Sequence, residues 1–271
     1  MRANPANLVA LNNIKETIMN DFETFSQLHY NNTPLVIGNA WDVSSAKLFE
    51  ENGFKAVATS SAAIADTLGY KDGQNMSFDM LLENAIRIKR NISVPLSVDM
   101  ERGYADTIPG ILENIDQLHE AGVVGINIED SLPDAKLRST ESFQKIISAI
   151  ANHLSRKNRQ FFINVRTDTF LLKIPNALEE TLNRAKAYEA AGANGIFVPF
   201  IYDINEIKKV VAGTSLPVHV LSMKELPDFS ILADAGVKRI SMGSWLYRAM
   251  KRWMQQTLTS IQTDQNFSSI F

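Results

Sequence analysis

Cysteine is absent from the 271 residues of this chain. That absence excludes disulfide bonds, thiolate metal sites and a cysteine nucleophile, and it fits a reducing compartment. Long apolar runs are also missing, since no stretch approaches the about 20 apolar residues of a membrane span. The short apolar run at residues 8–11 is too short for a secretory signal. We therefore expect a cytoplasmic, globular protein that does not enter a membrane.

Neither sign of charge dominates the sequence. Lysine and arginine number 27 and aspartate and glutamate 30, so the formal charge is −3 and no basic field for nucleic acid is expected. Hydrophobic residues make up 45% of the chain, enough for a sizeable core. The length suits one α/β barrel, which commonly takes about 250 residues, so we expect a single domain over residues 1–271.

A repeated pattern runs through the chain: a helical stretch, a glycine that ends it, and a short apolar run. The glycines are Gly53, Gly122, Gly192 and Gly236. Glycine at this place is typical of a helix end, because it adopts positive φ without strain. The apolar runs that follow are typical of buried parallel strands. Four more such runs lie at residues 34–38, 95–99, 161–165 and 217–221.

The pattern predicts eight strands that alternate with helices. Examples of the predicted helices are residues 80–92, 111–120, 142–154 and 177–190. Strict alternation indicates a parallel sheet, and eight units is the number that closes a barrel. The sequence therefore predicts the α/β class and a (β/α)8 TIM barrel, with an open doubly wound sheet as the alternative.

Two further helices are expected to flank the barrel. One lies within residues 1–31, from Asn13 to Tyr30, and the other within residues 244–262. The second carries an apolar stripe at helical spacing, formed by Leu246, Met250, Trp253, Met254, Leu258 and Ile261. This stripe fits either packing on the barrel wall or a contact between subunits. The polar tail at residues 263–271 is expected to be loose.

Three carboxylates follow the third and fourth predicted strands. Asp99 and Glu101 are two residues apart, so on a strand they project to one side, and Glu129 ends the neighbouring strand. The active site of such a barrel lies at these strand ends. Clustered oxygen ligands favour Mg²⁺ or Mn²⁺, with water in the remaining positions. We expect a metal site here; independently solvated acids are the alternative.

Arg166 ends the fifth predicted strand, next to these acids. Its guanidinium suits a carboxylate or a developing oxyanion, although pairing with Asp168 or Glu129 alone would also explain it. Ser60 and Ser61 follow the second predicted strand and could orient a carboxylate or simply form a turn.

The remaining candidates are less specific. Among the histidines, His219 lies inside the seventh predicted strand and is expected to be a buried, hydrogen-bonded side chain. Gly243 and Ser244, after the eighth strand, fit a phosphate-binding helix start or, more simply, a turn. No zincin motif, phosphate-binding loop or Ser-His-Asp order is present.

Taken in order, these segments resemble the isocitrate lyase/phosphoenolpyruvate mutase superfamily from about residue 34 to residue 250. The segments that carry the resemblance are 39–42 (NAWD), 59–61 (TSS), 68–72 (LGYKD), 97–104 (SVDMERGY), 127–131 (NIEDS) and 165–168 (VRTD). The family's fold is a barrel whose last helix is exchanged between subunits of dimers or tetramers. The resemblance thus implies a homodimer or homotetramer and explains the apolar stripe.

The resemblance also implies roles for individual residues. It implies a Mg²⁺ site, partly through water, at Asp99, Glu101 and Glu129. It implies contacts to a substrate's carboxylate and oxo groups from Ser60, Ser61, Arg166 and Trp41. The catalytic candidates it indicates are Arg166 and Asp72.

The loop after the fourth strand departs from the family pattern. Lyases of the family carry a Lys-x-Cys-Gly-His motif there, whose cysteine is the acid/base, whereas residues 131–139 contain neither cysteine nor histidine. The Asn-Ser of the phosphonomutases is missing too. Ala58 stands where those enzymes have tryptophan, and residues 198–200 lack the histidine of the mutases. Neither the usual isocitrate cleavage nor phosphonomutase activity is therefore expected.

The features shared with the family favour a metal-dependent lyase or decarboxylase that acts on a small 2-oxo or 2-hydroxy dicarboxylate through a pyruvate-like enolate. Decarboxylation of an oxaloacetate-like acid is the simplest such reaction, because the enolate forms as CO₂ leaves and no base is needed. Two alternatives stay open. One is phosphorus–carbon chemistry at the same site, and the other is a binding protein that holds a 2-oxo acid without turnover.

Overall fold

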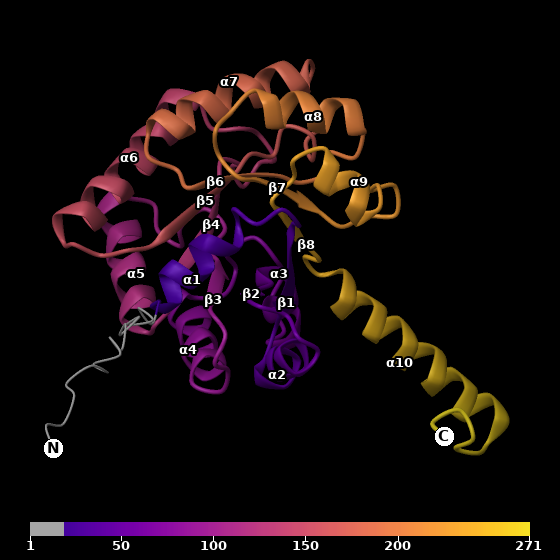
Figure 1. The fold of residues 1–271 in the computed structure, drawn as a ribbon. Helices are drawn as coiled ribbons and strands as arrows, with labels where there is room; N and C mark the ends of the chain where they lie inside the picture. The colour runs from indigo at the N-terminus through magenta and orange to yellow at the C-terminus, as the bar shows by residue number, and fades with distance from the viewer. Residues whose placement is uncertain (1–18) are drawn as a thin grey trace, which may run out of the picture.

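The computed structural model describes residues 19–271, in which eight parallel strands form a closed barrel in sequential order (Figure 1). The strands are β1 (Leu35–Ala40), β2 (Val57–Thr59), β3 (Leu96–Asp99), β4 (Gly125–Glu129), β5 (Phe162–Arg166), β6 (Gly195–Val198), β7 (Val218–Leu221) and β8 (Arg239–Ser241). Because β8 pairs back onto β1, the predicted TIM barrel is confirmed and the open sheet is excluded.

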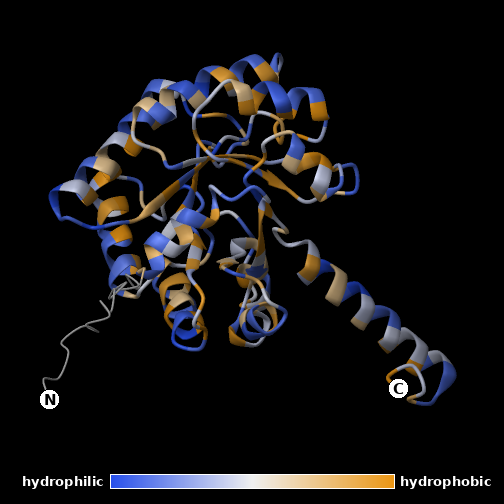
Figure 2. Ribbon diagram, viewed as in Figure 1, coloured by the Kyte–Doolittle hydropathy of each residue, from blue (hydrophilic) through white to orange (hydrophobic). Residues whose placement is uncertain are grey.

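Helices alternate with the strands and surround the barrel (Figure 1). They are α1 (Asp21–Leu28), α2 (Val43–Glu51), α3 (Ser61–Thr67), α4 (Phe78–Lys89), α5 (Ile108–Glu120), α6 (Thr140–Arg156), α7 (Ala177–Ala190), α8 (Ile204–Ala212), α9 (Phe229–Asp234) and α10 (Trp245–Asp264). The four predicted helix-ending glycines all have positive φ, between 83° and 101°. Figure 2 shows the strands in hydrophobic colours and the helices with mixed faces.

The N-terminal helix is shorter than predicted. Within the described residues, α1 starts at Asp21 rather than Asn13, and residues 13–18 lie outside the described part. A capping box fixes this start: Asn20 Oδ1 accepts from the Glu23 N–H at 2.9 Å, and the Glu23 carboxylate accepts from the Asn20 N–H at 3.0 Å. This reciprocal pair satisfies the free amides of the first turn, so the helix begins there.

Helix α1 covers the amino-terminal end of the barrel. Its buried Phe25 packs edge-on against Phe162, at the start of β5, with ring centroids 5.4 Å apart. Leu35 and Ile37 of β1 belong to the same apolar cluster. With that end covered by α1, the carboxyl ends of the strands carry the open cavity described below.

The barrel interior is more polar than the apolar strand runs suggest. Asn164 Nδ2 donates to Asn127 Oδ1 at 2.7 Å and lies 3.0 Å from His219 Nδ1. His219 is therefore buried as predicted, but its Nε2 has no hydrogen-bond partner in the described structure. The larger apolar cluster lies outside the barrel wall, where residues such as Ile126 and Ile147 belong to one core.

Helix α10 projects away from the barrel (Figure 1). It runs to Asp264, so the tail that was predicted to be loose from residue 263 begins within the helix. Side chains of its apolar stripe are exposed; Trp253, for example, is 58% exposed. The stripe is thus not packed on the wall of its own barrel. No helix in residues 19–271 combines the length and apolar character needed to cross a membrane.

Candidate active site

Five of the predicted site residues line one cavity at the carboxyl ends of the strands. They are Ser60, Ser61, Asp72, Asp99 and Arg166, and the cavity measures about 270 Å³. The barrel brings them together because parallel strands end at the same rim. This volume suits a small organic acid.

Asp99 is the last residue of β3. Its Oδ2 accepts a hydrogen bond from the Ser61 hydroxyl at 2.8 Å, and its backbone N–H donates to Thr59 Oγ1 at 2.9 Å. Burial raises the pKa of Asp99 to about 6, although the nearby Arg166 guanidinium opposes that shift. The site therefore contains a buried carboxyl group whose ionised form is disfavoured by its surroundings.

Glu101 lies beyond the end of β3, with φ of 46°, so the argument from strand alternation is wrong at this position. The strand stops at Asp99 because the chain turns there, with the Gly103 N–H donating to the Met100 carbonyl at 2.8 Å. The Glu101 carboxylate instead accepts from the Tyr104 hydroxyl at 2.7 Å. Burial, and then the charge of Asp99, raise the pKa of Glu101 to about 8.

Glu129 ends β4 and is already partnered. Its Oε2 lies 3.0 Å from Arg166 Nη1, and its Oε1 accepts from the Ser131 hydroxyl at 2.7 Å. Arg102 Nη1 is 3.7 Å from the same Oε1. Neither Glu129 nor Glu101 lines the cavity.

The donor set fits a divalent cation held partly through water. Within residues 19–271, no three aspartate, glutamate or histidine side chains lie close enough to enclose a metal ion by themselves. Mg²⁺, however, commonly keeps several waters and uses one or two carboxylates. Asp99 and Glu101 are acids whose pKa values are raised mainly by burial, so a cation bound beside them would favour their ionised forms. The set of Asp99, Glu101 and Glu129 stays a prediction.

Arg166, at the end of β5, makes both of the ion pairs considered from the sequence. Its Nε and Nη2 donate to the two carboxylate oxygens of Asp168 at 2.6 and 3.1 Å, in addition to the contact with Glu129. The planar guanidinium is therefore held in one orientation while it lines the cavity.

Sequence reasoning missed the buried network behind Arg166. Asp130 Oδ2 accepts from Arg184 Nη1 at 2.9 Å, Tyr188 Oη at 2.9 Å and Thr167 Oγ1 at 2.7 Å. Asp130 Oδ1 accepts from the backbone N–H of Asp168 at 3.0 Å. The sequence signal that could have indicated this network is Arg184, a charged residue close to the apolar stripe of the helix predicted at residues 177–190.

Asn39 of β1 also belongs to the site. Its Oδ1 accepts from the backbone N–H groups of Met242 and Gly243 at 2.8 and 2.9 Å, which fixes the turn after β8. The Gly243 amide is used within the protein, which fits the turn interpretation, while the phosphate interpretation stays untested. The sequence signal that could have indicated this role is a polar residue, Asn39, at the end of an otherwise apolar strand run.

Trp41 is not brought to the cavity. Its ring packs against Tyr247 of α10, with centroids 5.1 Å apart, and it lines a separate groove between α2 and α4. A substrate contact from Trp41 is therefore not supported by its position. The loop at residues 131–139 is a tight turn, closed by the Leu132 N–H to Lys136 carbonyl hydrogen bond of 2.7 Å.

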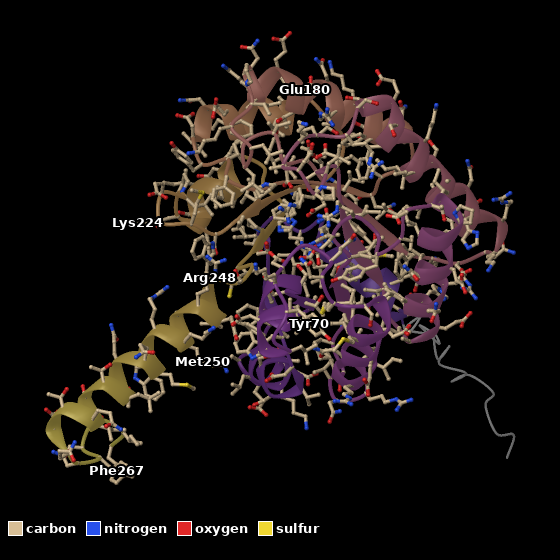
Figure 3. All side chains as sticks on the ribbon, turned by 180° about the vertical axis from the view of Figure 1, so that it is seen from behind. Tyr70, Glu180, Lys224, Arg248, Met250 and Phe267 are labelled. Atoms are coloured by element: carbon tan, nitrogen blue, oxygen red, sulfur yellow. The ribbon has the colours of Figure 1, made fainter. Side chains whose placement is uncertain are left out.

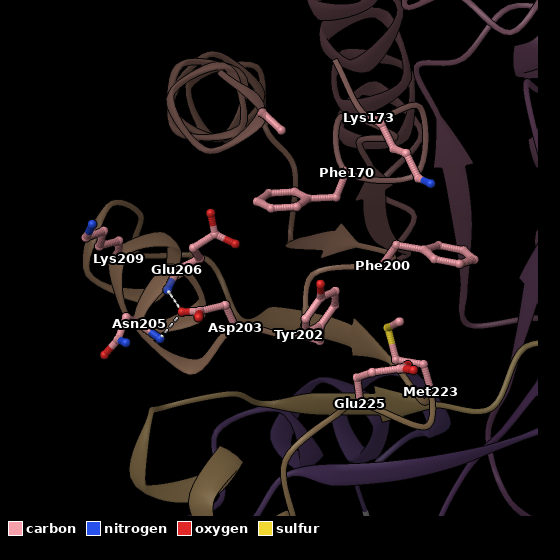
Figure 4. Close-up of a pocket in the computed structure, with 11 residues that line it drawn as sticks. Phe170, Lys173, Phe200, Tyr202, Asp203, Asn205, Glu206, Lys209, Met223 and Glu225 are labelled. Carbon is pink, nitrogen blue, oxygen red and sulfur yellow. Dashed lines mark hydrogen bonds between the residues drawn. The ribbon is translucent and has the colours of Figure 1, made fainter. Parts of the chain in front are cut away.

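A larger cavity, of about 870 Å³, lies beside the candidate site (Figure 4). It is formed by segments that follow β5, β6 and β7, and Phe200 lines both cavities. Its Asp203 is engaged as the N-cap of α8, accepting from the N–H groups of Asn205 and Glu206. The cavity contains none of the predicted site residues, so we assign the chemistry to the smaller one.

Comparisons with known proteins find relatives over most of the chain and solved structures with the same fold. An uncharacterised protein of Mycobacterium tuberculosis is 33% identical over 83% of this chain and 84% of its own length. An oxaloacetate decarboxylase of Ectopseudomonas mendocina is 28% identical over 78% of this chain and 74% of its own. A Burkholderia cenocepacia crystal structure, provisionally described as a phosphonomutase, is 36% identical with a TM-score of 0.82, covering 87% of this chain and 98% of its own.

The strongest of these findings is a family model. The model described as phosphoenolpyruvate phosphomutase matches residues 25–262, which is most of the chain and includes every strand of the barrel. The chain therefore belongs to the phosphoenolpyruvate phosphomutase family, within the isocitrate lyase/phosphoenolpyruvate mutase superfamily.

Proposed function

We propose that this protein is a Mg²⁺-dependent lyase or decarboxylase of a small 2-oxo or 2-hydroxy dicarboxylate, with an oxaloacetate-like acid as the preferred substrate. One observation carries this proposal. Among residues 19–271, the side chains that line the cavity with Asp99 and Arg166 include no histidine, lysine or tyrosine, and its other carboxylate, Asp72, lies exposed. Retro-aldol cleavage needs a base at the departing hydroxyl, whereas decarboxylation of a 3-carboxylated 2-oxo acid needs none.

In this proposal the hydroxyls of Ser60 and Ser61 and the guanidinium of Arg166 bind the carboxylate and oxo groups at the 2-oxo end. Asp99, Glu101 and Glu129 would hold Mg²⁺, partly through water, and the bound cation would supply Lewis-acid polarisation of the 2-oxo group.

The bond between C3 and its carboxylate then breaks. Its electron pair forms the enolate and CO₂ leaves, while Arg166 stabilises the negative charge that develops on the oxygen. Asp72 is exposed at the cavity, so it can carry a proton from solvent to C3 and complete the pyruvate-like product.

The oxaloacetate decarboxylase of Ectopseudomonas mendocina supports this choice of reaction. Phosphorus–carbon chemistry is the second candidate, since the Burkholderia cenocepacia structure is described in those terms. Incubation with phosphonopyruvate, followed by phosphorus NMR, distinguishes the two, because an unchanged spectrum excludes the second.

Pyruvate release tests the main proposal. We would assay oxaloacetate and a panel of related acids with Mg²⁺ and with EDTA, using Asp99→Ala as the inactive variant. Asp134→Ala is the control, since Asp134 is exposed and pairs with the exposed Lys136. Absence of metal-dependent turnover on every acid contradicts the enzyme proposal. If those acids still raise the melting temperature in a Mg²⁺-dependent way, the binding-protein alternative replaces it.

The assembly and location form part of the same proposal. We infer a homodimer or homotetramer in which α10 packs against a partner. Large apolar side chains such as Trp253 and Leu258 are exposed on this helix, and burying them against another subunit is favourable. Sedimentation of the wild type and of Trp253→Glu tests it, and a monomeric wild type contradicts it. We take residues 1–271 as a single domain that works in the cytoplasm.

A further inference from the structure

The candidate site and the larger cavity beside it share a boundary at the carboxyl ends of β5, β6 and β7. Phe170 lines the larger, outer cavity, whereas the next residue, Leu171, lines the candidate site, or inner cavity. In the same way Leu221, the last residue of β7, lines the inner cavity and Met223 lines the outer one. The wall between the two cavities is therefore formed by neighbouring side chains of the same segments.

Phe200, on the segment after β6, is the residue common to both cavities within residues 19–271. Figure 4 shows its ring pointing away from Phe170 and Tyr202, both of which line the outer cavity. Phe170 packs against the larger apolar core, but Phe200 is a member of neither apolar cluster in the described residues. Packing of the core therefore does not explain why a phenylalanine stands at this boundary.

The backbone of Phe200 adopts a conformation that favours glycine. Its φ is 65°, in the left-handed region, where a bulky side chain is strained. Such conformations cluster at ligand-binding sites, where the surrounding structure holds them. Together with the place of the ring between two cavities, this indicates a role in the site rather than in the stability of the fold.

The inner cavity has a polar side and an apolar side. Its polar side chains include Ser60, Ser61, Asp99, Arg166 and Arg248, the last of which Figure 3 shows where α10 leaves the barrel. Its apolar side chains include Leu171, Phe197, Pro199, Phe200 and Leu221. An acid held through its carboxylate and oxo oxygens on the polar side turns its carbon atoms toward the apolar side. A carbon branch on such an acid extends toward Phe200.

We infer that Phe200 closes the inner cavity toward the outer one and so limits the length of an apolar branch at C3 of the substrate. This inference rests on the proposed function, which places a 2-oxo dicarboxylate in the inner cavity. A short branch contacts the Phe200 ring, whereas a longer branch collides with it and no longer fits into about 270 Å³. Phe200 is thus a specificity residue with no part in the chemical step.

The outer cavity can receive a longer branch once the Phe200 ring is removed. It measures about 870 Å³, and Phe170, Tyr202 and Met223 contribute apolar area to it. Lys224, next to Met223, is exposed at the edge of the molecule (Figure 3), so this cavity borders solvent. Each methylene of the branch that becomes buried there should raise the affinity about threefold to fourfold. Because the contact is equal in the ground and transition states, it lowers KM and leaves kcat unchanged.

A series of acids with branches of increasing length tests the inference. We would measure CO₂ release from oxaloacetate and from its derivatives with a methyl, propyl or hexyl group at C3, with Mg²⁺ present and the spontaneous reaction subtracted. For the wild type, kcat/KM should fall about tenfold or more from the methyl to the hexyl acid. For Phe200→Gly, kcat/KM for the hexyl acid should exceed the wild-type value about tenfold or more, through KM. The value for oxaloacetate itself should stay within about threefold.

Two variants make the result specific. Phe200→Leu keeps a smaller apolar side chain at the boundary and should shift the length limit only part of the way. Phe229→Ala is the matched control, because Phe229 is an exposed phenylalanine that lines neither cavity, and it should keep the wild-type profile. Glycine suits the backbone at position 200, so Phe200→Gly should fold, and its melting temperature checks this.

The outcomes separate the inference from the proposed function. The same dependence on branch length in the wild type and in Phe200→Gly, or a wild type that uses the hexyl acid as well as the methyl one, overturns the inference. A wild type that decarboxylates none of the acids overturns the proposed reaction alone, because titration of the same acids with Mg²⁺ should still show the length limit in their affinities. If neither the wild type nor Phe200→Gly binds any of them, both are wrong.

Discussion

Asp168 holds the guanidinium of Arg166 through two hydrogen bonds, of 2.6 and 3.1 Å, just beyond the end of β5. The pair is itself positioned from behind, because the backbone N–H of Asp168 donates to the fully buried Asp130. Arg166 is thus oriented before any substrate arrives, which removes an ordering cost from binding and catalysis.

The first prediction concerns this orientation. Asp168→Asn removes the ionic, two-point contact, so Arg166 should sample other orientations and kcat for pyruvate release should fall about tenfold to hundredfold. Asp168 does not line the cavity and is a positioning residue. Steady-state kinetics with Asp134→Asn as the control provide the measurement. An unchanged kcat in a folded Asp168→Asn protein would show that Glu129 alone suffices.

The second prediction concerns the buried pair of Asp130 and Arg184. Arg184→Met leaves the Asp130 carboxylate without its cation in the interior, and the free energy of unfolding should fall by about 3–5 kcal/mol. Urea denaturation measures this. The control is Arg87→Met, whose partner Glu83 is exposed, and its effect should stay within about 0.5 kcal/mol. Similar losses for both variants would contradict the assigned role.

The third prediction concerns pH. Glu101 has a folded-state pKa of about 8 against an ordinary value of 4.5, so the folded protein binds more protons between these values. In EDTA, stability should therefore fall from pH 6.5 to 8, by about 1–2 kcal/mol. Below that window His29, whose pKa burial lowers to about 3, adds an opposing trend.

Mg²⁺ should reverse this dependence, because the cation binds the deprotonated carboxylates and its stabilising effect grows with pH. Melting temperatures at several pH values, with and without Mg²⁺, provide the measurement. The fall in EDTA should disappear in Glu101→Gln. If wild-type stability is flat between pH 6.5 and 8, Glu101 is ionised throughout and the prediction is wrong.

The fourth prediction concerns Arg239 at the start of β8. Its guanidinium is completely buried and none of its three nitrogens has a hydrogen-bond partner in the described structure. Burial lowers its pKa to about 9. An unpaired buried charge is unfavourable, so Arg239→Met should leave stability unchanged or raise it by about 1–3 kcal/mol. A large loss in urea denaturation would show that an acceptor is bound there.

Most of the barrel is predictable from the sequence because its signals are local. Each strand is a short apolar run, and each preceding helix ends at a glycine such as Gly122 or Gly192, whose positive φ the structure shows. Asp99 and Arg166 are predictable for the same reason, because they directly end such runs and parallel strands end at one rim.

Other features depend on contacts between distant segments. Arg184 meets Asp130 across 54 residues, and nothing near either residue in the sequence indicates this. Arg248 reaches the cavity only because Tyr247 attaches the start of α10 to the barrel. The position of Glu101 depends on the turn after β3, where side chains no longer alternate between two faces as they do along an extended strand.

Helix α10 is continuous from the turn that carries Arg248 to the exposed Trp253 and Leu258. Because Tyr247 attaches the first turn to the barrel, a partner that covers the later turns is held in a fixed position relative to the rim of the cavity. Under the proposed assembly, dilution separates the subunits and exposes this face of α10 again. Enzyme concentration thereby becomes a variable that any kinetic comparison of this protein must hold constant.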